Sequence, residues 1–210
     1  IDMRYQHIVF DIDNTLLDSE TALLTTWQQT LQHIVGKSYT IDQLRPILGM
    51  TGAIAMTTYG ITDLPTGYKV WGEYYMTNHK SVVFFPGVME MLQKLKESGL
   101  KLGVITSRKR SEYDAEPLMK ELEPYIDTII CSDNTPRPKP DGAPIESYCR
   151  VAKTTPSDMI YIGDTFNDFM CARNGGCHFG LSELGVVEKE KIEADYYFDS
   201  TEKMLDILLG

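Results

Sequence analysis

The sequence predicts an α/β protein in which helices cover both faces of a parallel β-sheet and a mainly helical segment follows the first strand. Three observations lead to this prediction. An apolar run near the N-terminus has the length of one buried strand. From residue 86 onward, strand-like and helix-like segments alternate, which is typical of a parallel sheet with crossover helices. Between these two parts, residues 17–82 do not continue this alternation and show mainly helical patterns.

The first strand is "HIVF" at residues 7–10, and the chain then enters the helical segment. Residues 19–36 have the spacing of an amphipathic helix, with Ser19 in position to cap it. "TIDQLRPILG" and two further helical stretches, rich in Met, Tyr and Trp, extend to residue 80. The predicted domains are a core made of 1–16 and 83–210, and a helical domain made of 17–82.

The second part of the chain follows a regular order of strand and helix. A Pro-Gly pair precedes its first helix, and Pro117 is expected in the first turn of the next one. Strands are predicted at 100–107, 126–132, 158–164, 177–181 and 195–200, and helices at 86–99, 111–124, 141–153, 166–176 and 201–210. The expected fold is Rossmann-like, with right-handed crossovers and a ligand beyond the carboxyl ends of the strands.

Composition narrows the class of protein. The formal net charge is −10 and the only basic cluster is "RKR" at 108–110, so nucleic acid and anionic membranes are not expected as partners. No apolar run approaches the roughly 18 residues of a membrane span, and "HIVF" is too short for a signal peptide. The four cysteines lack CxxC spacing, which favours reduced thiols in a cytoplasmic protein.

Four polar segments follow the ends of predicted strands. Their candidate residues are Asp11, Asp13 and Thr15; Thr106, Ser107 and Arg108; Lys139, which prolines flank; and Asp164 with Asp168. Because parallel strands end at one edge of the sheet, these side chains should share one crevice. Carboxylates so close together repel one another unless a cation lies among them, and Mg²⁺ suits a site made of oxygen ligands.

These four segments, in this order and spacing, resemble the signature motifs of the haloacid dehalogenase superfamily. The phosphatase branch fits best, with a helical cap inserted after the first strand, as in phosphoglycolate phosphatase-like and β-phosphoglucomutase-like proteins. "FFPGV" at 84–88 resembles the return from the cap to the core. The resemblance implies that Asp11 is the nucleophile that becomes an aspartyl phosphate. It also implies that Asp13 is the general acid for the leaving oxygen and then the base for water.

The resemblance further assigns the residues that hold the phosphoryl group. Thr106 and Lys139 are expected to bind its oxygens, with Ser107 as the alternative to Thr106. Arg108 is expected either to contact the phosphate or to be a solvated residue at a helix start. Arg45, in the helical segment, is expected either to reach the substrate or to have a structural role.

The same resemblance implies a Mg²⁺ site made by Asp11, the backbone carbonyl of Asp13 and Asp164, with Asp168 in support. Asp13 must carry a proton at one stage, so its pKa is expected above the roughly 4 of a free aspartate. Asn14 stands where the commonest form of the first motif has Gly. Asn tolerates a left-handed backbone, so the turn stays feasible, and the substrate class remains open.

The leading functional hypothesis is a Mg²⁺-dependent phosphatase that acts on a small phosphorylated metabolite, as a monomer or homodimer. The nearest alternatives are a phosphomutase of the β-phosphoglucomutase type and a nucleotidase or pyrophosphatase. A degenerate module that binds a phosphorylated ligand without turnover is the non-enzyme alternative. A dehalogenase would not need Asp13, and a phospho-accepting receiver domain would have no cap.

The expected cap carries its own predictions. Its aromatic residues Trp71, Tyr74 and Tyr75 are interpreted as cap core in preference to a platform for base stacking. The two linkers, 16–19 and 82–86, are expected to hinge the cap over the crevice, so that closure excludes bulk water and the cap selects the leaving group.

Overall fold

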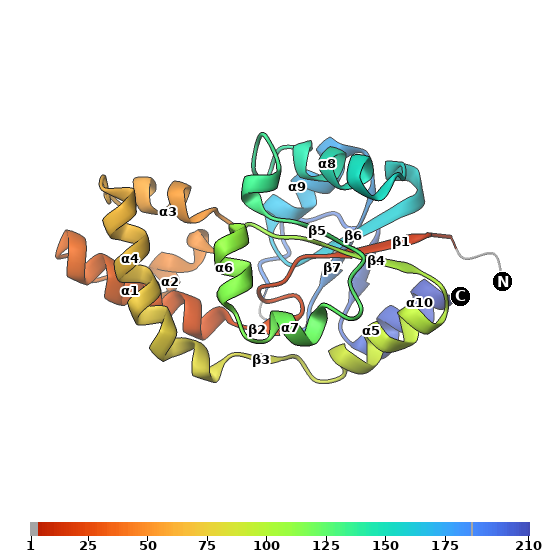
Figure 1. The fold of residues 1–210 in the computed structure, drawn as a ribbon, viewed down its shortest axis with the longest axis horizontal. Helices are drawn as coiled ribbons and strands as arrows, with labels where there is room; N and C mark the ends of the chain where they lie inside the picture. Colours follow the sequence, from red (N-terminus) through yellow and green to blue (C-terminus); the bar gives the residue numbers. More distant parts are fainter. Residues whose placement is uncertain (1–3, 186) are drawn as a thin grey trace.

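The protein is described here by a computed structural model that covers residues 4–185 and 187–210. Its main sheet has the strand order β5-β4-β1-β6-β7-β8, and each pairing is parallel (Figure 1). The strands are β1 (His7–Phe10), β4 (Lys101–Ile105), β5 (Thr128–Ile130), β6 (Met159–Gly163), β7 (His178–Ser182) and β8 (Tyr196–Phe198). The strand order reverses beside β1, as in Rossmann-like sheets, so the predicted fold class is confirmed.

Helices form a layer on each side of this sheet. Helices α5 and α10 lie on one face, and α8 and α9 lie on the other (Figure 1). Along β1, Ile8 and Phe10 join the first hydrophobic layer and Val9 joins the second, as the two-residue period of a strand requires. The elements are α5 (Val88–Glu97), α6 (Arg110–Ala115), α7 (Met119–Leu122), η3 (Ser132–Asn134), α8 (Ala143–Ala152), η4 (Pro156–Asp158), α9 (Phe166–Gly175) and α10 (Thr201–Leu209).

One predicted helix of the core is wrong in its extent. Residues 111–124 form two short helices, α6 and α7, instead of one, and Pro117 lies between them rather than in a first turn. Glu116, the residue before the proline, has an extended backbone (φ −83°, ψ 113°). A residue that precedes proline is disfavoured in helical geometry, so the helix ends at this point.

The segment between β1 and α5 forms a separate helical unit, which lies beyond the carboxyl edge of the sheet (Figure 1). It contains α1 (Glu20–Val35), α2 (Ile41–Leu44), η1 (Arg45–Ile47), α3 (Gly52–Thr58), α4 (Leu64–Asn78) and η2 (His79–Ser81). Its own hydrophobic cluster includes Leu24, Leu31 and Leu44, all fully buried. Among the helices that the structure describes, none is both long and apolar enough to cross a membrane.

Helix α1 begins where the periodicity predicts and ends at Gly36, which has the left-handed backbone (φ 72°) of a helix C-terminus. Ser19 precedes the helix as expected, but its side chain makes no capping hydrogen bond. The Ser19 hydroxyl instead donates to the carboxylate of Asp13 at 2.8 Å. The cap prediction for Ser19 is therefore wrong, because a stronger acceptor competes for its hydroxyl.

The two connections between the helical unit and the core lie side by side. They form β2 (Leu17–Asp18) and β3 (Val83–Phe84), an antiparallel pair with Leu17 opposite Phe84. In addition, the backbone N–H of Phe85 donates to the carbonyl of Leu16 at 3.0 Å. Two linkers were predicted at 16–19 and 82–86, but their pairing was not predicted.

Candidate active site

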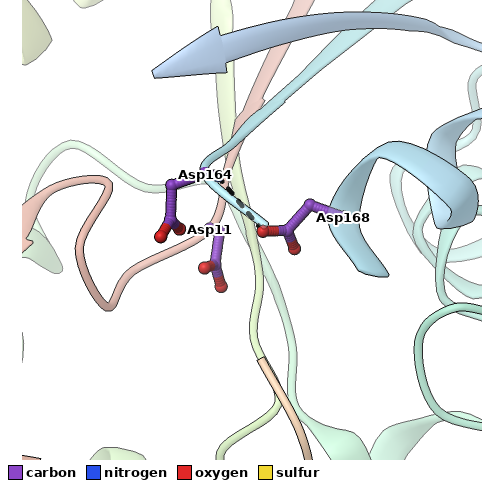
Figure 2. Close-up of side chains that lie close together, drawn as sticks. All are labelled: Asp11, Asp164 and Asp168. Carbon is purple, nitrogen blue, oxygen red and sulfur yellow. Dashed lines mark hydrogen bonds between the residues drawn. The ribbon is translucent and has the colours of Figure 1, made fainter. Parts of the chain in front are cut away.

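The carboxyl ends of three neighbouring strands bring the predicted polar residues together. Asp11 follows β1, Thr106 follows β4 and Asp164 follows β6. Carboxylate oxygens of Asp11, Asp164 and Asp168 lie within 4.8 Å of one another, and all three residues are buried (Figure 2). The convergence that the sequence predicts at this edge of the sheet is therefore present in the fold.

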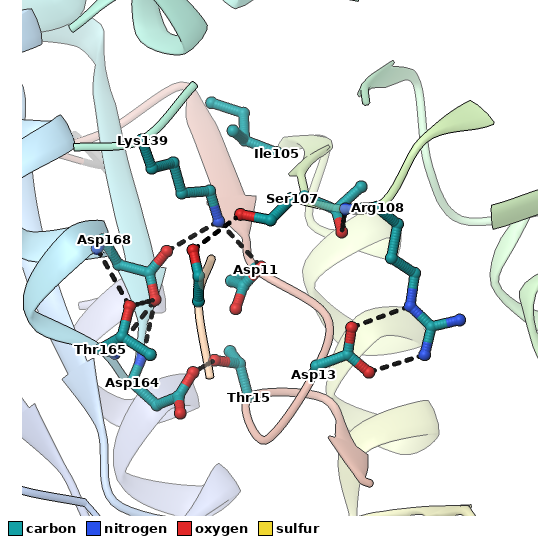
Figure 3. A network of polar contacts seen from close by, with 12 residues as sticks. Asp11, Asp13, Thr15, Ile105, Ser107, Arg108, Lys139, Asp164, Thr165 and Asp168 are labelled. Carbon is teal, nitrogen blue, oxygen red and sulfur yellow. Dashed lines mark hydrogen bonds and ion pairs between the residues drawn. The ribbon is translucent and has the colours of Figure 1, made fainter. Parts of the chain in front are cut away.

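Lys139 places its charge directly among these acids. Its Nζ lies 3.0 Å from Oδ1 of Asp11 and 2.7 Å from Oδ1 of Asp168 (Figure 3). The side chain is only 2% exposed. Although burial alone would lower the pKa of Lys139, the charges of Asp11 and Asp168 raise it above the ordinary lysine value. Lys139 is thus a fixed positive charge beside Asp11.

Asp168 is held by donors on both oxygens. One oxygen accepts from Lys139 and from the Tyr161 hydroxyl, at 2.7 and 2.8 Å. The other accepts from the hydroxyl and backbone N–H of Thr165, at 2.8 and 3.0 Å, and from the backbone N–H of Asp164 at 3.2 Å. Asp168 also lies outside the described lining of the large cavity. Its contacts are those of a residue that positions Lys139 and the loop after β6.

Asp164 is oriented by the turn that follows Asp11. The Asn14 amide donates to one of its oxygens at 3.0 Å, and the Thr15 hydroxyl donates to the other at 2.9 Å. Asn14 has a left-handed backbone (φ 59°), as the sequence analysis considered feasible. A glycine at this position would keep the turn but lose the amide. The sequence analysis missed this contact, which joins residues 150 positions apart.

Lys139 alone does not balance the negative charge of the three buried acids Asp11, Asp164 and Asp168. Burial first, and then the charge of Asp168, raise the pKa of Asp11 to about 7, even though Lys139 opposes the shift. Burial and the charges of Asp168 and Asp11 also raise the pKa of Asp164 well above its ordinary value. A divalent cation bound by oxygen atoms would relieve this repulsion, so the residues present fit Mg²⁺.

The pKa of Asp13 is shifted in the direction opposite to the one expected from the sequence. Burial would raise its pKa, but the adjacent charge and hydrogen bonds of Arg108 and a hydrogen bond from Ser19 hold the pKa below the ordinary aspartate value. Nε and Nη2 of Arg108 lie 2.8 and 2.7 Å from the two oxygens of Asp13 (Figure 3). The predicted upward shift is therefore wrong in this geometry, because a two-point ion pair outweighs burial and the neighbouring acids.

Arg108 is also buried, so the solvated helix-start residue considered for it is wrong. Its Nη2 lies 3.2 Å from the Tyr75 hydroxyl, which donates to Glu116 at 2.7 Å. Tyr75 belongs to α4 of the helical unit, whereas Arg108 and Glu116 belong to the core. This contact links the two parts of the molecule directly above Asp13.

The two hydroxyl residues that follow β4, Thr106 and Ser107, lie in different surroundings. The Thr106 hydroxyl accepts the backbone N–H of Arg108 at 3.1 Å and lies outside the described lining of the large cavity. Ser107 lines that cavity, and its hydroxyl donates to the Gly49 carbonyl at 3.1 Å. Gly49 has φ +83°, and a Cβ there would approach the Thr165 side chain to 2.9 Å. Only glycine allows the helical unit to approach the core so closely at this point.

Arg45 has the structural role among the two considered for it. It pairs with Glu20 and, through Nε at 3.1 Å, with Asp42, both within the helical unit. It is absent from the described residues that line the cavity. The expected contact between Arg45 and a substrate therefore finds no support in this geometry.

A cavity of about 710 Å³ lies between the helical unit and the core. Asp11, Asp13 and Asp164 are among the core residues that line it, together with Ser107 and Arg108. The remaining wall comes mainly from α1, α3 and α4 and is largely apolar. The structure thus has a polar floor, lined by Asp11, Asp13 and Asp164 and supported by their partners, among them Lys139, which contacts Asp11 from outside the described lining, and a largely apolar wall opposite it.

Comparisons with known proteins agree with this geometry. The family model described as haloacid dehalogenase-like hydrolase matches residues 8–181. The pyrophosphatase PpaX of Bacillus velezensis is 26% identical, over 99% of this chain and 96% of its own length. A crystal structure from Lactobacillus plantarum, provisionally named a phosphoglycolate phosphatase, has a TM-score of 0.85 at 25% identity and covers 98% of this chain and 100% of its own. CbbY from Rhodobacter sphaeroides in complex with phosphate has the same fold, with a TM-score of 0.85, 18% identity, and coverage of 98% and 100%.

Proposed function

Because the chain belongs to the haloacid dehalogenase-like hydrolases, we propose that it is a Mg²⁺-dependent phosphatase that forms an aspartyl phosphate on Asp11. The observation that carries this proposal is the position of Asp11. It lies 3.0 Å from the Lys139 ammonium, within 4.8 Å of Asp164, and on the lining of the cavity. A carboxylate in this position can approach a bound phosphoryl group while neighbouring positive charge offsets the repulsion between them.

In the first step, an Asp11 oxygen attacks phosphorus and the bond from phosphorus to the ester oxygen breaks. The departing oxygen takes a proton from Asp13, so the alcohol leaves neutral. Lys139 and a hydroxyl of Thr106 or Ser107 hold the equatorial phosphoryl oxygens. Asp13 must first acquire that proton and leave its pair with Arg108, since the pair favours the ionised carboxylate.

In the second step, ionised Asp13 takes a proton from water while the water oxygen attacks the phosphorus of the aspartyl phosphate. The bond between phosphorus and the Asp11 oxygen breaks, which releases inorganic phosphate and restores the Asp11 carboxylate. The ion pair with Arg108 favours the ionised Asp13 carboxylate, which is the charge state that this step requires. Arg108 keeps the carboxylate in place between the steps.

Asp11, Asp164 and the backbone carbonyl of Asp13 would hold the Mg²⁺, and Asp168 would support them through the loop after β6. When bound, the ion supplies positive charge that neutralises the phosphoryl oxygens and the attacking carboxylate. Asn14 and Thr15 already fix the orientation of Asp164, so this ligand is arranged in advance.

We assign residues 17–82 to a cap that covers the site, joined to the core through β2 and β3. Contacts of Gly49 with Ser107 and of Tyr75 with Glu116 hold the cap against the core. Closure in this position keeps bulk water away from the phosphoryl group. Pyrophosphate hydrolysis is a second candidate function, because relatives named pyrophosphatase PpaX match nearly the full chain at 21–26% identity.

The proposal is tested by measuring phosphate release from a panel of phosphomonoesters, with Mg²⁺ and with a chelator. We expect Mg²⁺-dependent release, and a loss of about 10⁴-fold or more in Asp11→Asn, since the nucleophile is removed. Asp18→Asn is the matched control, because Asp18 is an exposed aspartate of the nearby β2. Full activity of Asp11→Asn, or no release from any ester or from pyrophosphate, would contradict the proposal.

A further inference from the structure

We infer that the leaving group of the substrate is a bulky, uncharged and largely apolar alcohol, bound by the cavity wall that α1, α3 and α4 build above Asp11. This inference rests on the proposed function, because it names the class of phosphomonoester that the same site would hydrolyse. It follows from the size of the cavity, the side chains of its wall and the charges around it.

The cavity is much larger than a phosphoryl group with a small acid attached. Its volume of about 710 Å³ lies within the roughly 300–1,000 Å³ of pockets that enclose drug-sized ligands. The carboxylates of Asp11 and Asp164 line the same cavity, so a ligand seated on them extends directly into this space. A diphosphate or a two-carbon acid would leave most of the wall without contacts.

The wall offers aromatic and aliphatic surface. Trp71 and Tyr75 stack on each other with ring centroids 4.7 Å apart, and Trp27 lies 6.0 Å from Trp71. These three rings line the cavity together with Met56 and Ile47. Tyr74, the third aromatic residue considered in the sequence analysis, is absent from the described lining and contacts His33 instead. Trp71 and Tyr75 are therefore available to pack against an apolar ligand.

The charges around the cavity disfavour a second anionic group on the substrate. Besides the titratable groups His79, Tyr68 and Tyr75, the described lining holds the cations Lys69, Arg108 and Lys109 and the acids Asp11, Asp13, Glu73, Glu112 and Asp164. Arg108 is neutralised by Asp13, and Nζ of Lys109 lies 3.8 Å above the Tyr68 ring. Lys69 is exposed to solvent. The described lining therefore carries five acids against three cations, and this excess of negative charge disfavours a second phosphate or a carboxylate on the substrate.

Alkyl phosphates test the inference, because methyl, butyl and hexyl phosphate differ in apolar surface and hardly in leaving-group chemistry. With Mg²⁺ present, we expect kcat/KM to rise about threefold per added methylene, on the order of 100-fold from methyl to hexyl. 5-Carboxypentyl phosphate has a carboxylate in place of the terminal methyl group of hexyl phosphate, and we expect its kcat/KM to be at least about tenfold lower than that of hexyl phosphate. Pyrophosphate and phosphoglycolate are expected to be poorer substrates than hexyl phosphate.

A filled cavity provides the second test. Gly72 lines the cavity on α4, and a Cβ there would meet no other atom within 4 Å. Gly72→Leu should therefore fold and occupy ligand space, lowering kcat/KM for hexyl phosphate at least about tenfold and for methyl phosphate much less. Thr77→Leu is the matched control, because Thr77 is exposed on the same helix and lies outside the described lining.

These experiments distinguish a failure of the inferred apolar leaving group from a failure of the proposed phosphatase function. If neither the esters nor pyrophosphate release phosphate, the proposed phosphatase itself is wrong. If methyl phosphate, phosphoglycolate or pyrophosphate is cleaved as well as hexyl phosphate, the phosphatase stands and the apolar leaving group is overturned. An equal loss for methyl and hexyl phosphate in Gly72→Leu also overturns it, because the wall would then not discriminate between them.

Discussion

The floor and the wall of the cavity are built in opposite ways. On the floor, each charged group is held by partners from distant parts of the chain, as Asp164 is by Asn14 and Thr15. On the wall, side chains such as Trp71 and Met56 make apolar contacts without fixed directions. Directional bonds tolerate little displacement, whereas apolar packing tolerates substitution when volume is conserved. We therefore expect the proposed chemistry to depend on the floor and the choice of substrate to depend on the wall.

Among the changes to the floor, removal of Arg108 should cause the largest loss in the free energy of unfolding. We expect Arg108→Met to lower the free energy of unfolding by about 3 kcal/mol at pH 7, because partly buried Asp13 keeps only the Ser19 hydroxyl as a partner and buried Glu116 loses its nearby cation. Arg108 lowers the pKa of folded Asp13, so its contribution is present above roughly pH 4 and is lost as the pH falls through the lower folded value. Urea unfolding at several pH values measures this.

A double-mutant cycle with Asp13→Asn supplies the control for Arg108→Met. The two substitutions together should cost less than the sum of the single ones, because they remove the same ion pair. Strict additivity would show that Asp13 and Arg108 do not interact in solution.

Binding of Mg²⁺ should stabilise the floor and leave the wall unaffected. With Mg²⁺ at about a hundred times its Kd, the free energy of unfolding should rise by about 2.7 kcal/mol, since the unfolded chain has no assembled site. Asp164→Asn should abolish most of this increase, and Asp18→Asn should retain it. Chemical unfolding with and without Mg²⁺ measures the effect, and an undiminished increase in Asp164→Asn would place the ion elsewhere.

The Tyr75 hydroxyl is the point where the wall contacts the floor. Tyr75→Phe keeps the ring but leaves buried Glu116 without its 2.7 Å donor, so we expect a loss of about 1.5 kcal/mol in the free energy of unfolding. Tyr74→Phe removes an exposed hydroxyl from the same helix and should change stability by less than about 0.5 kcal/mol. Equal effects of the two substitutions would show that wall and floor are not coupled through this contact.

The smallest expected effect is at Asn14. Asn14→Gly keeps the left-handed turn but removes the amide that orients Asp164, so the affinity for Mg²⁺ should fall about tenfold. A Mg²⁺ titration of phosphate release measures this change. Unchanged affinity would mean that Thr15 alone orients Asp164.

The sequence predicted the features that repeat along the chain. Strand and helix periods located each strand of the main sheet, and the polar residues after β1, β4 and β6 converge as expected. The sequence did not predict which residue each charged side chain would pair with. Arg108 follows a strand and could face phosphate or solvent, and only the assembled fold brings it to Asp13, 95 positions away.

The cavity wall could not be predicted from the sequence, for a different reason. A helical period shows that one face of α4 is apolar, but it does not distinguish a face that packs against protein from one that borders a cavity. Trp71 and Tyr75 were therefore interpreted as cap core, and the cavity that they line became visible only with the neighbouring helices in place. The break at Pro117 was not predicted, because the pattern of apolar residues continues across it.

The pairing of β2 with β3 limits how the cap can move. Leu17 and Asp18 lie opposite Phe84 and Val83 in an antiparallel pair, so the two connections between the helical unit and the core form one short ribbon. A two-stranded ribbon bends readily out of its own plane, but shearing it would break its hydrogen bonds. If residues 17–82 act as the proposed cap, we therefore expect them to swing about one axis and to return the apolar rings to the same distance from Asp11 at each closure.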